Sequence, residues 1–234
     1  MARPDPEILK RLRARIWALE RTAPAASEAL SLAAAIDDAL PWGGLPLACL
    51  HEVVAADAAG GGFCAALLGR LAARGPVLWC MRRGSDEPYA PGLAAFGLSP
   101  ERLILARCDD DRQVLWTMEE ALRCPAVGGV LGEVGAINLT AGRRLQLAAE
   151  AGGVTGLLIL PPAARPTGAA TSRWRVRAAA SSPAPWGGLG EARWQVTLER
   201  CRGGVQRSWL LEWRHDGGGL AVVGSLDDGR LQAC

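Results

Sequence analysis

The 234-residue sequence contains a single lysine, Lys10, whereas its other basic side chains are all arginines. It has only two histidines, which argues against a histidine-rich metal site. Its seven cysteines include no CxxC pair, and this pattern favours reduced, buried thiols over disulfides or a zinc site. It shows no signal peptide and no apolar run near the roughly twenty residues of a membrane helix. We therefore expect a cytoplasmic protein with no metal, no cofactor and no membrane contact.

Apolar residues make up 50% of the chain, and the net charge is only +2. A chain of this length and composition can bury the core of one domain with short extensions. The small net charge argues against a protein that coats nucleic acid, because such binding depends on many phosphate contacts.

Residues 1–22 have the pattern of an amphipathic helix. Its apolar positions recur at helical spacing, and its arginines and Lys10 occupy the other face. These apolar positions are Ile8, Leu9, Leu12, Ile16 and Leu19. Residues 23–39 are predicted to form a linker and helical lead-in. The first segment needs a partner surface, either on its own domain or on another chain.

Residues 40–214 alternate between strand-like and helix-like segments, which predicts βαβ units and a mostly parallel sheet flanked by helices. The expected strands are Leu47–Ala55, Pro76–Met81, Arg102–Arg107, Val127–Leu131 and Val154–Leu160. The expected helices are Phe63–Ala73, Ala90–Phe96, one capped by Asp109–Asp111, and one from Thr140 to Ala151. Three later segments alternate with period two and predict antiparallel strands at the sheet edge: Arg173–Arg177, Arg193–Leu198 and Ser208–Trp213. Residues 215–234 are rich in turn residues and are expected to form a tail.

The turn after the first expected core strand is the usual place for a phosphate-binding loop. Its length fits the pattern GxxxxGK[ST], but Ala55 replaces the first glycine, Gly61 the lysine and Gly62 the hydroxyl residue. Without the lysine, the phosphates of a nucleotide would lose their main cation, and without the hydroxyl, Mg²⁺ would lose a ligand. The carboxylate of Asp57 would also repel an anion. Gly60 and its neighbours still offer backbone N–H groups, so weak nucleotide or sulfate binding stays open, but hydrolysis does not.

Glu133 follows the expected strand Val127–Leu131, where an acidic residue would organise Mg²⁺ and water in an ATPase. Without the partner hydroxyl, we interpret it as an acid that caps a helix or forms a salt bridge.

Two stretches resemble the RecA family: Trp42–Pro46 (WGGLP) followed by Leu50–Val54 (LHEVV), and Asp86–Ala90 (DEPYA). The resemblance implies a RecA-like P-loop-type domain. It also implies that Arg82 or Arg83 stands at the position of the water-activating glutamate, and Pro161 and Pro162 at that of the phosphate-sensing glutamine. With four ATPase positions altered, the chain is expected not to be an enzyme.

The chain is identified as a member of the ImuA family by a set of stretches between about residues 40 and 213. They read LPWGGLPLACLHEV, GPVLWCMRR, PYAPGL, VLWTMEEALRC, LTAGRRLQLAAEAGGVTGLLI, SRWRV and RWQVTLERCRGG. The resemblance implies an SOS-induced accessory protein of error-prone translesion synthesis. It would bridge an ImuB-type Y-family protein and a DnaE-type polymerase, with RecA as a further partner to consider. The alternative is a SulA-like cell-division inhibitor that acts on FtsZ.

The resemblance to RecA also suggests contact surfaces. The helix at residues 1–22 would dock on ImuB, on RecA or on another copy, or fold back on its own domain. The loop from Pro161 to Arg173 carries Arg165 and Arg173 as candidate DNA contacts, although solvated loop arginines are common. We expect any DNA contact to be weak or indirect. Among the C-terminal tryptophans, Trp186 in a Pro-Trp-Gly-Gly loop is the candidate anchor for a partner, whereas the others fit core packing better than base stacking.

Overall fold

The computed structural model describes residues 28–181, 187–188, 190–201, 204, 206–214, 219–227 and 230–233. A small two-stranded sheet pairs β1 (Ala29–Leu30) with β2 (Leu45–Pro46). The remaining strands form one sheet: β3 (Leu50–Val54), β4 (Val77–Arg82), β5 (Leu103–Cys108), β6 (Gly129–Glu133), β7 (Thr155–Leu160), β8 (Ser172–Ala179), β9 (Arg193–Cys201), β10 (Arg207–Arg214), β11 (Gly219–Asp227) and β12 (Arg230–Ala233). The helices are α2 (Ala34–Asp37), α3 (Ala59–Leu71), α4 (Ala90–Ala95), α5 (Asp111–Leu122) and α6 (Leu139–Gly152), with 3₁₀ turns at Ala72–Arg74 and Pro100–Arg102.

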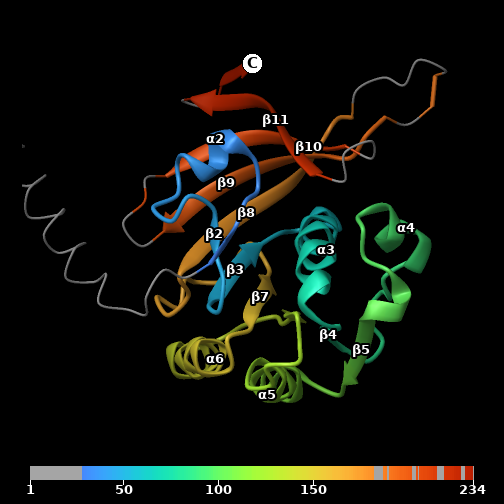
Figure 1. The fold of residues 1–234 in the computed structure, drawn as a ribbon, viewed down its shortest axis with the longest axis vertical. Coiled ribbons are helices and arrows are strands. Elements are labelled where there is room, and N and C mark those ends of the chain that lie inside the picture. Colours follow the sequence, from blue (N-terminus) through green and yellow to red (C-terminus); the bar gives the residue numbers. More distant parts are fainter. Residues whose placement is uncertain are drawn as a thin grey trace, which may run out of the picture.

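The large sheet has the order β12-β11-β10-β9-β8-β3-β7-β6-β4-β5 (Figure 1). Strands β8, β3, β7, β6, β4 and β5 run parallel. In chain order, from β3 to β8, each of them is joined to the next by a crossover that carries a helix or a long loop, as parallel strands require. From β8 to β12 the strands run antiparallel. The predicted α/β architecture, with a mostly parallel central sheet and antiparallel strands added by the C-terminal part, is confirmed.

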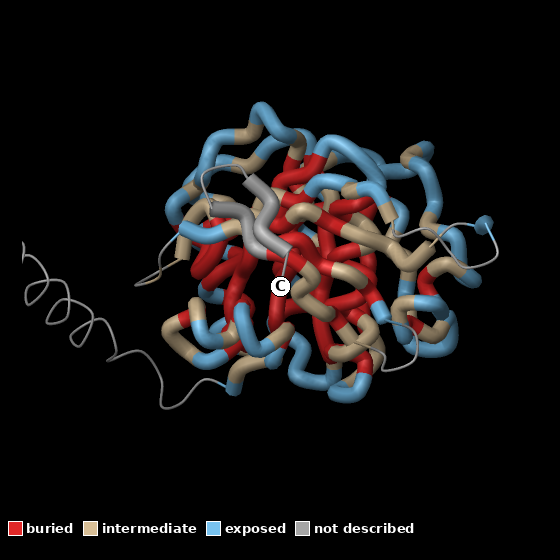
Figure 2. Tube along the Cα trace, turned by 90° about the horizontal axis from the view of Figure 1, so that it is seen from above, coloured by how far each residue is buried: buried red, intermediate tan, exposed pale blue. Residues whose placement is uncertain are grey.

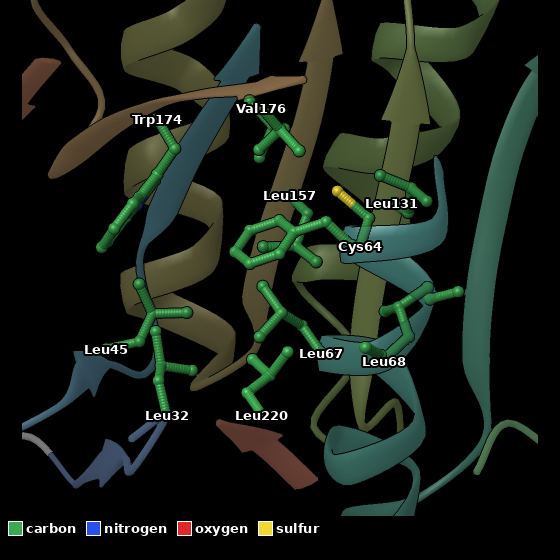
Figure 3. Packing of buried hydrophobic residues seen from close by; sticks show 14 of the residues in the cluster. Leu32, Leu45, Cys64, Leu67, Leu68, Leu131, Leu157, Trp174, Val176 and Leu220 are labelled. Carbon is green, nitrogen blue, oxygen red and sulfur yellow. The ribbon is translucent and has the colours of Figure 1, made fainter. Parts of the chain in front are cut away.

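Two apolar layers cover the two faces of the parallel strands. On one face α3 packs its buried side chains on β6, β7 and β8, and Figure 3 shows Cys64, Leu67 and Leu68 beside Leu131 and Leu157. On the other face α5 and α6 cover a second cluster that includes buried Met118 and Leu145. The parallel strands are therefore apolar on both sides, and Figure 2 shows buried backbone running through the middle of the molecule.

The ends of the helices follow local signals in the sequence. Asp110 caps α5, and its carboxylate accepts a hydrogen bond of 2.7 Å from the backbone N–H of Gln113. At α6 the cap is Asn138, which accepts a hydrogen bond of 2.8 Å from the N–H of Ala141, so the helix begins before Thr140, the start that the sequence predicts. Asn138 fits because its backbone is extended, as the N-cap position requires.

The expected turn-rich tail at residues 215–234 contains two strands, so that expectation is corrected. β11 pairs with β10 from Ser208↔Leu226 to Arg214↔Gly219, and β12 pairs with β11. The glycines and aspartates that suggested a tail flank the short apolar run that begins at Leu220, and Leu220 is buried. The free edge of β10 supplies the hydrogen bonds that turn this run into a strand.

Within the described residues, no helix is both long enough and apolar enough to cross a membrane.

Candidate functional site

The loop between β3 and α3 is closed by its own side chains. The backbone N–H of Ala55 donates to the carbonyl of Leu160 at 3.1 Å, which continues the β3–β7 pairing into the loop. The side chain of Asp57 accepts a hydrogen bond from the N–H of Ala59 at 3.0 Å, and the N–H of Gly60 lies 3.3 Å from the carbonyl of Asp57. The first turn of α3 therefore directs its N–H groups to Asp57, where a phosphate loop would direct them to an anion.

Ala55 and Gly60 are in close contact across this loop. A Cβ atom at position 60 would lie 2.5 Å from the Cβ of Ala55, which is closer than two carbon atoms can pack. Gly60 is thus required by the alanine at position 55. The side chain of Ala55 therefore fills the space inside the loop at the position where the pattern GxxxxGK[ST] has its first glycine.

Aromatic rings occupy the space in front of Gly61 and Gly62. The nearest atoms to a Cβ at position 61 are two ring carbons of Trp79, both at 3.9 Å. At position 62 they belong to Trp194, at 3.4 and 3.7 Å, and to Phe96, at 3.8 Å. These are the two positions at which a phosphate loop carries lysine and serine or threonine, and here the first atom of either side chain would already contact an aromatic ring.

Trp79 joins the loop to Glu133. Its indole N–H donates a hydrogen bond of 2.5 Å to Oε1 of Glu133, and Trp79 itself is only 4% exposed. Burial raises the pKa of the Glu133 carboxyl above its usual range, and the hydrogen bond from Trp79 opposes that rise. Burial also raises the pKa of the nearby Cys64 thiol, and the charge of Glu133 adds to it. The acidic side chain at the end of β6 is therefore held by an indole inside the α3 face of the sheet.

Two arginines, at the last position of β4 and directly after it, stand where the RecA resemblance implies a glutamate. Arg82 lies 3.5 Å from Asp111 and Arg83 lies 3.2 Å from Asp109, so both bind the acidic start of α5. Asp111 also accepts a hydrogen bond of 2.7 Å from the N–H of Gly135, after β6. These contacts tie the ends of β4 and β6 to the start of α5.

The structure separates the two arginines of the expected DNA loop. Arg165 is exposed in the loop between β7 and β8, whereas Arg173 lies in β8 and is 2% exposed. Arg173 pairs with the buried Glu52 at 2.5 Å and with Glu199 at 3.1 Å, and it donates to the carbonyl of Ala164 at 2.7 Å. The expectation that Arg173 faces DNA is corrected, because its guanidinium is used inside the protein.

Two buried polar groups were not singled out from the sequence. Glu52 lies in β3, where it also accepts a hydrogen bond of 2.5 Å from the hydroxyl of Thr167. His51, next to it, contacts the carbonyl of Pro46 at 2.9 Å and the hydroxyl of Ser172 at 2.7 Å. Burial lowers the pKa of His51 to about 4, so the ring is neutral at pH 7. The sequence does contain a signal for them, because His51 and Glu52 are ionisable residues in a strand that is otherwise apolar. Such residues need polar partners when they are buried.

Five of the expected partner contacts lie outside the described residues. They are Ile8, Leu12, Ile16, Leu19 and Trp186. The four other C-terminal tryptophans lie within the described residues and are all buried: Trp174, Trp194, Trp209 and Trp213. Within the described residues, no three histidine, cysteine or acidic side chains are grouped so that they could hold a metal ion.

Comparison with known proteins gives the family. No protein-family model matches the chain. The chain is 40% identical over 215 residues to Protein ImuA of Caulobacter vibrioides strain NA1000 / CB15N, and the match covers 82% of this chain and 87% of the relative. The same values hold for Protein ImuA of Caulobacter vibrioides strain ATCC 19089 / CIP 103742 / CB 15. The chain belongs to the ImuA family.

Proposed function

We propose that this chain is a non-enzymatic, RecA-like accessory protein of the ImuA–ImuB mutagenesis system. It acts in the cytoplasm during SOS-induced, error-prone translesion synthesis. Its task is to bridge an ImuB-type protein and a DnaE-type polymerase through protein–protein contacts. Family membership supports the mutagenesis system, and the loop after β3 supports the absence of ATP chemistry.

The observation that carries the proposal is the indole of Trp79. The ring lies next to Gly61, the position of the lysine in the pattern GxxxxGK[ST], and its N–H donates a hydrogen bond to the carboxylate of Glu133. One side chain therefore contacts both positions at which an ATPase would bind phosphate and Mg²⁺. A nucleotide would need to displace this buried ring and the Asp57 carboxylate from the start of α3. It would gain no lysine, because the only lysine in the chain is Lys10. Phosphoryl transfer depends on such cations and on Mg²⁺ for charge stabilisation, and the loop supplies neither.

The sheet is consistent with the RecA-like assignment. β3 lies inside the parallel part of the sheet, and the loop after it leads directly into a helix that covers one face. This is the arrangement in which α/β proteins bind phosphates at the carboxyl ends of strands. The chain keeps that scaffold and fills its binding site with its own side chains, which leaves the outer surface for partners.

The bridging role can be tested with three purified proteins: this chain, the ImuB-type protein and the DnaE-type polymerase. We expect size-exclusion chromatography to give one complex that contains all three, and we expect the polymerase to separate from the ImuB-type protein when this chain is omitted. Equal association of those two proteins without this chain would contradict the bridging role. Binding of FtsZ, with no binding of the ImuB-type protein, would favour a SulA-like inhibitor instead.

A further inference from the structure

An open groove runs between the outward faces of α5 and α6, which lie side by side in Figure 1. Its volume is about 790 Å³, which falls in the range of ligand-binding clefts, about 300–1,000 Å³. None of the residues that close the loop after β3 lines this groove. Its main lining residues are Arg112, Trp116 and Glu119 of α5, Asn138 at the cap of α6, and Ala141 and Arg144 of α6.

Trp116 differs from the other apolar side chains of α5. It is 59% exposed, whereas Val114, Met118 and Leu122 are fully buried against the sheet. Burying a tryptophan removes a large apolar area from water, so an exposed one leaves that free energy available to a partner. Tryptophan and arginine are also the residues that most often dominate protein–protein interfaces. Trp116 and Arg112 lie one helical turn apart on the same side of α5.

The charges of the groove favour a protein over a nucleic acid. Three carboxylates, those of Asp109, Asp110 and Glu119, outnumber the two arginines of the lining. The lining is therefore not the continuous row of positive charges that binding to a phosphate backbone needs.

The carboxylates of the groove already have partners. Asp109 pairs with Arg83, and Asp110 caps α5. Glu119, with 9% of its side chain exposed, pairs with Arg123 and Arg144 at 2.8 and 2.7 Å. Arg112, in contrast, forms no ion pair within the described part of the chain. The charge that remains for a partner to complement is thus positive and lies beside the exposed indole.

We propose that the groove between α5 and α6 binds a segment of the ImuB-type protein that places an apolar side chain against Trp116 and a carboxylate against Arg112. This inference rests on the proposed function for the identity of the partner. The apolar contact supplies affinity, and the ion pair fixes the orientation of the segment.

The test measures the affinity of the full chain for the purified ImuB-type protein by biolayer interferometry. We expect Trp116→Ala and Arg112→Glu each to weaken binding by about tenfold or more, as truncation of an interface hot spot does. Arg112→Lys keeps the charge and should retain most of the affinity. The matched control is Leu147→Ala, which removes another half-exposed apolar side chain from α6, outside the lining of the groove, and should change affinity less than about twofold.

The outcomes separate the groove from the function on which it rests. If the wild-type chain binds the ImuB-type protein and both groove variants bind equally well, the groove assignment is wrong and the proposed function stands. If the wild-type chain does not bind it at all, both fail. Two further results would overturn the assignment: binding of a single-stranded oligonucleotide that is lost in Trp116→Ala, and a dimer of this chain that dissociates in the same variant. Circular dichroism of each variant checks that it is folded.

Discussion

Replacing Gly60 by alanine would place a methyl group 2.5 Å from the Cβ of Ala55. At the next residue, Gly61, the nearest atoms to an added Cβ are ring carbons of Trp79 at 3.9 Å, which is ordinary van der Waals contact. Both glycines lie in the first turns of α3. The same substitution at adjacent positions should therefore change the free energy of unfolding in opposite directions.

The magnitudes follow from two opposing effects. Alanine is favoured over glycine in a helix by about 0.5–1 kcal/mol, and this gain applies in full only to Gly61→Ala. Overpacking of a closed site costs about 1–3 kcal/mol, and Cβ atoms on two backbones cannot move aside as a flexible side chain can. We expect Gly60→Ala to lower the free energy of unfolding by about 0.5–2 kcal/mol and Gly61→Ala to raise it by up to about 1 kcal/mol.

Urea denaturation of the two variants and of the wild type measures both effects. A third variant tests the cause: Ala55→Gly removes the opposing methyl group, so Gly60→Ala should cost less in that background than in the wild type. The expected coupling energy between positions 55 and 60 is about 1–3 kcal/mol. If Gly60→Ala is as stable as the wild type, or if the two substitutions are additive, the loop is not closed by this contact.

Three further predictions test buried polar groups. Arg173→Met leaves the Glu52 carboxylate buried without its guanidinium and should lower the free energy of unfolding in urea by about 3–5 kcal/mol. The double variant Glu52→Leu with Arg173→Met should recover most of that loss. A loss below about 1 kcal/mol in the single variant would argue against a structural role for the pair. Because the pKa of Glu133 is raised in the folded protein, its contribution to the free energy of unfolding is fully present below about pH 4.5 and is lost as the pH rises through its folded-state pKa. Glu133→Gln has no charge to bury, so it should become more stable relative to the wild type as the pH is raised through that pKa. Equal pH profiles of the two proteins in thermal unfolding would show that the carboxyl is not desolvated. The lowered pKa of His51 acts in the opposite direction: stability should fall by about 3 kcal/mol as the pH drops from 6.5 to about 4, and His51→Gln should lack this slope. A wild-type profile that is flat between those pH values would contradict a buried neutral ring.

The order of strands and helices could be read from the sequence because each element has a local signal. The run VTGLLIL predicted β7 within one residue of its ends, and the acidic residues before Val114 predicted the cap of α5. The start of α3 was placed four residues late, at Phe63 and not at Ala59. Three glycines in sequence resemble a loop, because glycine disfavours a helix, but here they lie within the first turns of α3.

Contacts between distant residues could not be predicted in the same way. Trp79 and Glu133 lie in strands that are separated by β5 and α5 in the sequence, and they meet only because β4 and β6 are neighbours in the sheet. Glu52 and Arg173 meet because β3 and β8 pair in register. The sequence shows that the loop after β3 lacks the lysine and the hydroxyl of the pattern GxxxxGK[ST]. Only the order of strands brings Trp79 and Glu133 together beside this loop.

The most direct test of the central claim is isothermal titration of the full chain with Mg-ATP and with ADP. If Trp79, Glu133 and Asp57 fill the phosphate site, no saturable binding should be detected up to about 1 mM nucleotide, which corresponds to a binding free energy weaker than about −4 kcal/mol. A saturable isotherm with a Kd of about 100 µM or tighter would contradict the claim, above all if Gly61→Trp, which adds a ring beside Trp79, abolished it.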